Sequence, residues 1–165
     1  MDIRIAKNEN DSKSASYIYA MSWKSAYKNI FSEHLLNEIS SDFWVDSFNS
    51  NYNTKRFEIA ILSVNNKDLG AGGYGLSRDY PEKEWGEITS IYFLEKDWGK
   101  GYSSEIMQFM IDKLRDMGCS KIHIWVLAEN IRAQKFYEKF SFRRSGAIKE
   151  ITFKGETKID VEFIL

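Results

Sequence analysis

Two stretches of this chain combine residue types and spacings that can carry chemistry. The first runs from Trp98 to Ser104 and places two glycines, a lysine and two serines directly before a helical pattern. Helix N-termini leave about four backbone N–H groups unpaired and carry partial positive charge. Glycine also lets the backbone approach a ligand closely. The stretch therefore predicts a loop that binds phosphate or pyrophosphate, although an ordinary tight turn before a capped helix has a similar sequence.

Two well-known phosphate-binding loops are excluded by the positions of these glycines. A Walker A loop needs a glycine several residues before Gly-Lys and a Ser or Thr directly after it. Here Leu94 occupies the early glycine position and Gly101 follows Lys100. A Rossmann loop needs three spaced glycines after the first strand of a β-α-β unit, and the stretch does not provide them.

The second stretch runs from Asn130 to Phe142. Asn130 stands where a helix N-cap is expected, so a purely structural role accounts for it. Tyr137 lies within the helical pattern, and a tyrosine there packs into a core more often than it reacts. Each residue alone is a weak indication of function, and the two stretches together are much more specific.

Together the two stretches resemble the signatures of the GCN5-related N-acetyltransferase (GNAT) family. The family's coenzyme A motif, Gln/Arg-x-x-Gly-x-Gly/Ala after the fourth strand, corresponds to residues 98–103, with Gly101 at the central glycine. Trp98 replaces the basic or amide residue, and Ser103 replaces the final glycine or alanine. The first departure removes one phosphate contact but leaves the backbone cradle, so it lowers the expected affinity more than it removes the site.

The family's second signature is Asn-x-x-Ala-x-x-x-Tyr, followed by a Gly-Phe pair. It corresponds to Asn130, Ala133 and Tyr137, and Ser141 stands where glycine is usual. A looser similarity to the first helix of many family members covers residues 23–31. The resemblance thus extends over nearly the whole chain and is strongest in residues 87–142.

The resemblance implies an acetyl-CoA-dependent acetyltransferase site. Its cofactor-binding residues are Ile91, Tyr92, Phe93, Trp98, Gly99, Lys100, Gly101, Tyr102, Ser103, Ser104 and Asn130. The Phe93 N–H is the implied donor to the thioester oxygen. Tyr137 is the implied general acid, because a phenol with a pKa of about 10 can return a proton to a thiolate whose thiol has a pKa of about 8.5. Glu87 is the implied general base, acting through water, although a solvent-facing strand glutamate is an equally good interpretation.

The implied reaction is transfer of an acetyl group from acetyl-CoA to a primary amine of a small molecule or peptide, by direct attack. Two alternatives remain: a coenzyme A-binding regulatory or interaction module that has lost catalysis, and a binder of nucleotide phosphates. The sequence does not define the acceptor. Trp23, Tyr27 and Phe31 form an aromatic stripe at helical spacing that suits a core or a pocket. The acidic loop at residues 79–84 is either simply solvated or attractive to a cationic amine.

A single site requires the fold to bring both stretches together. The remaining sequence patterns predict the strands and helices that would do so. Alternating or β-branched segments predict strands at about residues 3–5, 57–64, 69–76, 85–94, 122–126, 142–153 and 156–165. Helical patterns predict one helix from Asp11 toward Lys28 and further helices after Ser32 and after Ser41. Two more are predicted from Gly101 to about Met117 and from Asn130 to about Phe140. We expect one mixed α/β (α+β) domain over residues 1–165, with a mostly antiparallel sheet of about seven strands and about four helices. The resemblance adds that the sheet splays between its fourth and fifth strands.

Composition and charge narrow the range of partners. The chain has 165 residues and a formal net charge of -1, so no field of one sign attracts nucleic acid or an anionic membrane. Cys119 is the only cysteine and the two histidines are far apart, so neither an internal disulfide nor a metal site is expected. No signal peptide or membrane span is recognisable, and we expect the protein in the cytoplasm. The apolar alternation in residues 159–165 permits either a homodimer or a buried sheet face.

Overall fold

The computed structural model describes residues 1–54 and 56–165, and its strands form one mixed sheet in the order β1-β2-β3-β4-β5-β7-β6. The strands are β1 (Asp2–Ile5), β2 (Glu58–Val64), β3 (Lys67–Leu76), β4 (Trp85–Phe93), β5 (Lys121–Leu127), β6 (Arg143–Phe153) and β7 (Glu156–Ile164). Among the described residues, neighbouring strands pair antiparallel except β4 and β5, which are parallel. The predicted mostly antiparallel sheet of about seven strands is therefore confirmed.

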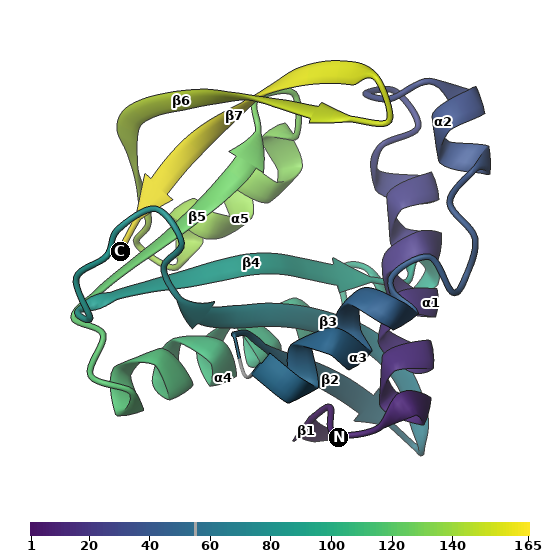
Figure 1. The fold of residues 1–165 in the computed structure, drawn as a ribbon, viewed down its shortest axis with the longest axis horizontal. Helices are drawn as coiled ribbons and strands as arrows, with labels where there is room; N and C mark the ends of the chain where they lie inside the picture. The colour runs from purple at the N-terminus through teal and green to yellow at the C-terminus, as the bar shows by residue number, and fades with distance from the viewer. Residues whose placement is uncertain (55) are drawn as a thin grey trace.

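Helices cover both faces of this sheet (Figure 1). They are α1 (Glu9–Ala26), α2 (Glu33–Asn37), α3 (Val45–Thr54), the 3-10 helix η1 (Glu95–Asp97), α4 (Tyr102–Asp116) and α5 (Ile131–Lys139). One buried core packs α4 and α5 against the sheet through residues such as Met110 and Tyr137, and a second packs α1 and α3 through Tyr19 and Phe48. None of the helices in the described ranges is long and apolar enough to cross a membrane.

The start of α1 differs from the prediction. Asn8 is its N-cap, because the Asn8 side chain accepts a hydrogen bond from the Asp11 N–H. Asp11 lies inside the first turn, where its carboxylate accepts a hydrogen bond of 3.0 Å from Arg4 Nε and so ties α1 to β1. Ser32 caps α2 as predicted, whereas residues 41–44 form a turn and α3 begins only after it, not directly at Ser41.

The hairpin between β2 and β3 places the sheet's central strands in register. Asn65 and Asn66 adopt positive φ angles of 51° and 59°, the geometry of a two-residue hairpin turn whose twist matches that of the strands. β3 therefore begins at Lys67, earlier than predicted. Farther along β3, a Cβ at Gly70 would lie 2.1 Å from Cε1 of Phe93, so only glycine leaves room for that ring at the end of β4.

β4 and β5 run side by side for only a few residues and then diverge, as the ribbon in Figure 1 makes plain. Their pairing ends at Glu87 and His123. Just beyond, the register of β4 against β3 shifts between Ile88 and Ser90, which leaves Thr89 as the extra residue of a β-bulge. The predicted splay between the fourth and fifth strands is present, and it leaves one edge of β4 without a neighbouring strand.

Candidate active site

A cavity of about 280 Å³ occupies the gap between β4 and β5. Seven of the predicted site residues line it, namely Ile91, Tyr92, Phe93, Trp98, Ser103, Asn130 and Tyr137. The other predicted residues do not line it, namely Glu87, Gly99, Lys100, Gly101, Tyr102 and Ser104. All of this second group except Glu87 belong to the loop and first turn that lead from η1 into α4, at one end of the cavity.

The N-terminus of α4 is built differently from those of α1, α2 and α5. Those three helices are capped by the side chains of Asn8, Ser32 and Asn130, whereas Gly101 at the N-cap of α4 has no side chain to donate or accept a bond. Gly101 has a φ of 87°, in the left-handed region that favours glycine. A Cβ built there meets nothing within 4 Å. The start of α4 is thus open to solvent and suited to an anion.

The charge of Lys100 is already engaged within this loop. Its Nζ donates to Asp97 Oδ1 at 2.7 Å, and that contact raises the pKa of Lys100. Asp97 is buried, and its second carboxylate oxygen has no hydrogen-bond partner among the described residues. Lys100 therefore neutralises a buried carboxylate beside the open N-terminus of α4, a role that the sequence did not reveal.

Arg132 brings a second cation to the same end of the cavity. Its guanidinium carbon lies 3.7 Å from the centre of the Trp98 ring, and both side chains line the cavity. Trp98 is held in place because its Nε1 donates to the Phe93 carbonyl oxygen at 2.8 Å. Partial burial lowers the pKa of Arg132, but an arginine remains charged at neutral pH. Arg132 lies within the second stretch, but nothing in that pattern assigns it a role.

The free edge of β4 presents backbone groups to the gap. The Leu94 N–H donates to Leu69 of β3 at 3.1 Å, so by strand alternation the backbone groups of Ile91 and Phe93 face the opposite edge. The Phe93 carbonyl oxygen indeed accepts from groups on that side, including the Ser22 hydroxyl at 2.9 Å. The backbone of Tyr92 faces β3, so this residue contributes its ring to the cavity.

Tyr137 of α5 reaches the cavity with a free hydroxyl. The residue is 6% exposed, and its ring packs beside Phe142 and Phe163. No described residue forms a hydrogen bond with its hydroxyl, and burial, with a smaller contribution from Tyr92, raises the pKa of Tyr137. The phenol is therefore protonated at neutral pH and free to donate. Asn130, as expected of an N-cap, accepts from the Ala133 N–H at 3.2 Å.

Glu87 is 1% exposed, and its carboxylate forms an ion pair with Arg78. Arg78 donates to its carboxylate from Nε at 3.0 Å, from the backbone N–H at 3.2 Å and from a terminal guanidinium nitrogen. It is therefore not the solvent-facing residue that the alternative interpretation expected. Accepting a proton would weaken the ion pair with Arg78, so Glu87 has a structural role that any catalytic role must accommodate.

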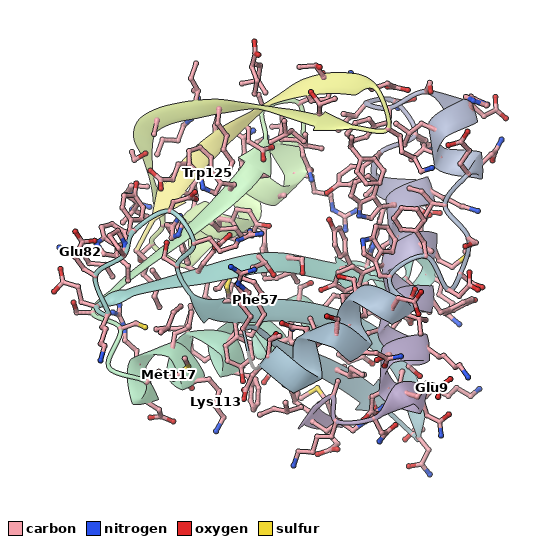
Figure 2. The ribbon with its side chains drawn as sticks, in the orientation of Figure 1. Glu9, Phe57, Glu82, Lys113, Met117 and Trp125 are labelled. Atoms are coloured by element: carbon pink, nitrogen blue, oxygen red, sulfur yellow. The ribbon has the colours of Figure 1, made fainter. Side chains whose placement is uncertain are left out.

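The opposite end of the cavity is aromatic. Trp23, Tyr27 and Phe31 line it, and they also pack on each other, with Trp23 and Tyr27 ring centres 4.9 Å apart. The sequence left open whether this stripe belongs to a core or to a pocket, and the structure shows that it belongs to both. A second cavity of about 640 Å³ shares Trp23 and Tyr92 with the first. Of the side chains labelled in Figure 2, Trp125 lines the first cavity and Phe57 the second.

Two of the three carboxylates of the acidic loop between β3 and β4, those of Asp79 and Glu84, have partners on neighbouring segments. Asp79 accepts a hydrogen bond of 2.7 Å from Trp125 Nε1 and lies 3.7 Å from Lys149 Nζ. Glu84 accepts one of 2.7 Å from Lys121 Nζ. These contacts engage two of the loop's carboxylates within the protein and leave only the exposed Glu82, which favours the interpretation of the loop without a bound amine.

Comparison with known proteins agrees with this geometry. The model of the family described as "Acetyltransferase (GNAT) family" matches residues 17–142. A curated relative, a probable spermine N(1)-acetyltransferase of Bacillus subtilis subsp. natto (strain BEST195), is 29% identical over 92 residues. The matched segment covers 53% of this chain and 59% of that relative. The chain thus spans somewhat more than half the length of this relative.

Solved structures match over the full length of the chain. The PaiA N-acetyltransferase of Thermoplasma acidophilum, in complex with coenzyme A, gives a TM-score of 0.73 at 15% identity and covers 98% of both chains. A ribosomal-protein-alanine N-acetyltransferase from Brucella melitensis gives a TM-score of 0.77 at 15% identity, covering 100% of this chain and 99% of that one. At such low identity these similarities establish the fold.

Proposed function

The chain belongs to the acetyltransferase (GNAT) family, and we propose that it transfers an acetyl group from acetyl-CoA to a primary amine of a small molecule or peptide. The observation that carries the proposal is the cavity in the β4–β5 gap, which has an open helix N-terminus at one end and the free Tyr137 hydroxyl on its wall. The whole chain acts as a single domain in this proposal. The lone, buried Cys119 is compatible with a cytoplasmic location.

The residues at the α4 end fit a pyrophosphate. The backbone between Gly99 and Ser103, with Gly101 at the cap, offers N–H groups to an anion, whereas the N–H groups of Trp98 and Ser104 donate to backbone carbonyls. Arg132 supplies a positive charge at the position where Trp98 replaces the family's basic or amide residue. The free edge of β4 at Ile91 and Phe93 offers backbone groups to an extended amide-bearing arm such as pantetheine.

Acetyl-CoA supplies a thioester when bound, and the residues of this chain provide the polar groups around it. In this proposal the Phe93 N–H donates to the thioester oxygen, since its side of β4 has no partner strand. Tyr137 holds a proton for the departing sulfur. Glu87 takes the proton of the amine through water, because its carboxylate does not itself line the cavity. The amine attacks directly, with no covalent link to the protein.

Thermal-shift titration with acetyl-CoA, CoA and ATP tests cofactor binding first. A ligand at 100 times its dissociation constant adds about 2.7 kcal/mol of stability, so we expect a clear rise with acetyl-CoA and CoA. Protection by ATP alone would instead support the binder of nucleotide phosphates. Release of free thiol with a panel of amines then tests turnover, and the panel should include spermine because a relative is named for it. Cofactor binding without turnover on any amine would support the non-catalytic module.

A further inference from the structure

Asp160 of β7 presents a carboxylate to the cavity without a partner in the protein. It lines the cavity, and no hydrogen bond or ion pair joins its carboxylate to any residue in the described ranges. Two carboxylates of nearby strands are engaged by other groups. Glu87 pairs with Arg78, and Glu162 accepts from the Tyr80 hydroxyl at 2.8 Å and the Ser145 hydroxyl at 2.5 Å. Of these three, only Asp160 is left to meet a ligand.

The lysines nearest Asp160 are directed toward other groups. Lys149, its backbone partner on β6, places Nζ over the Trp125 ring at 4.1 Å. Lys158, two residues earlier on β7, places Nζ 3.5 Å from Glu129 Oε1. Neither side chain forms an ion pair with Asp160, so no cation of the described protein is in direct contact with this carboxylate.

The surroundings of this carboxylate suit a cation with an apolar chain. Trp23, Tyr27 and Tyr92 line the same cavity, and the faces of such rings attract cations. Burial raises the pKa of Asp160, with Lys149 acting in the opposite direction. A desolvated carboxylate of this kind is costly when alone and is stabilised by a positively charged ligand.

We propose that Asp160 binds an ammonium group of the acceptor and thereby selects diamines or longer polyamines. The inference rests on the proposed function and extends it to the substrate class. An amine must be neutral to attack a thioester, and a protonated amine held by a carboxylate has no free lone pair. The ammonium at Asp160 is therefore a second, non-reacting one, while another amine of the same molecule points toward Tyr137.

A matched pair of amines tests this selection, namely 1,4-diaminobutane and 1-aminobutane, which differ by one ammonium. We expect the wild-type protein to favour the diamine in kcat/KM by about tenfold or more. Asp160→Asn keeps the size of the side chain and removes its charge. It should raise the KM for the diamine about tenfold and reduce the preference for the diamine to near unity. The kcat/KM for the monoamine and the KM for acetyl-CoA should stay within about twofold of their wild-type values.

Three comparisons keep the result interpretable. Asp160→Glu retains the charge and should keep part of the preference, whereas Glu150→Gln removes an exposed carboxylate of β6 outside the cavity lining and should change nothing. Thermal melting with and without CoA reports whether each variant folds and keeps its cofactor site.

Two kinetic results would overturn the proposal: a wild-type protein without preference for the diamine, or an Asp160→Asn variant that loses turnover of both amines equally. The second result would mean that Asp160 acts on the reacting amine. Calorimetric titration of the diamine into the CoA-bound protein provides a readout that needs no turnover. Diamine binding that weakens in Asp160→Asn would support Asp160 even if the wild-type protein transferred no acetyl group, and equal binding would reject it.

Discussion

The Arg132 guanidinium lies 3.7 Å from the centre of the Trp98 ring, so the first turn of α5 and the loop before α4 are joined by a cation–π contact. Trp98 in turn donates its indole N–H to the Phe93 carbonyl oxygen at the end of β4. This chain of contacts links the three segments that surround the end of the cavity beside the N-terminus of α4. It also provides a positive charge where the family pattern has a basic or amide residue and this chain has Trp98.

Arg132→Ala should therefore weaken acetyl-CoA binding about tenfold, the size expected when one charged contact to a phosphate is lost. The same variant should bind S-acetylpantetheine, which lacks the phosphates, as well as the wild type does. Lys135→Ala, on the same helix and outside the cavity lining, is the matched control and should bind both ligands normally. Equal weakening of both ligands would mean that Arg132 acts only by packing against Trp98.

Tyr137→Phe should lower kcat by about 100-fold or more, because it removes the proposed proton donor and little else. The thermal shift with acetyl-CoA should persist, since the hydroxyl has no partner in the described protein. Burial raises the pKa of Tyr137 above its ordinary value, so the acid form persists as pH rises. We therefore expect no loss of wild-type kcat from this group between pH 7 and about 9. Unchanged kcat in the variant would remove Tyr137 from the mechanism.

Gly101→Ala tests the backbone of the anion loop. Its φ of 87° is in the left-handed region, where a Cβ costs about 1 kcal/mol even though the space around it is open. The variant should lose stability and also acetyl-CoA affinity. Gly118→Ala is the matched control, because Gly118 has a φ of 90° after the opposite end of α4. It should lose stability alone, and equal losses of affinity in both variants would contradict the loop's role.

Much of the fold could be predicted because its signals are local. Alternation identified the strands, and helical periodicity followed by Gly118 identified α4 and its end. The start of α1 could not be predicted in the same way, since residues 8–12 contain several side chains able to cap a helix. The choice among them is made by a tertiary contact, because Arg4 of β1 holds Asp11 inside the first turn.

The expected site residues that line the cavity belong to the strand, loop and helix of continuous motifs. The remaining parts of the site depend on contacts between segments that are distant in the sequence. Arg132 meets Trp98 only because α5 returns beside the loop before α4, and Asp160 reaches the cavity only because β7 inserts between β5 and β6. Neither residue stands out in a pattern of spacing. The Arg78 partner of Glu87 is near in sequence, but nothing in the loop between them distinguishes Arg78 from an ordinary surface residue.

Acidification should weaken the fold through the ion pair between Asp68 and Arg4. The Arg4 contact lowers the pKa of Asp68 from 3.8 to about 2, so its stabilising effect is complete above pH 3.8 and is lost as pH falls toward 2. Because both side chains are partly exposed, we expect about 1–2 kcal/mol at pH 7. Asp68→Asn should therefore be less stable at pH 7 and nearly equal to wild type at pH 2. Urea denaturation at both pH values measures the difference in unfolding free energy between the variant and the wild type. The same difference at pH 7 and at pH 2 would contradict the prediction.

The variant Glu87→Gln tests both the structural role of Glu87 and its proposed role as the general base. Removing the charge breaks the ion pair with Arg78, and we expect a loss of about 1–2 kcal/mol of stability because Arg78 itself is half exposed. If Glu87 accepts the proton of the amine, kcat should also fall by about 100-fold, and the acidic limb of the pH–rate profile should change. The control for this prediction is Arg78→Met, which breaks the same ion pair and keeps the carboxylate of Glu87. We expect it to lose more stability, because it leaves the buried carboxylate of Glu87 without its cation, and to keep most of its turnover. A Glu87→Gln variant that is less stable but keeps its kcat would leave Glu87 as a structural residue and require another base.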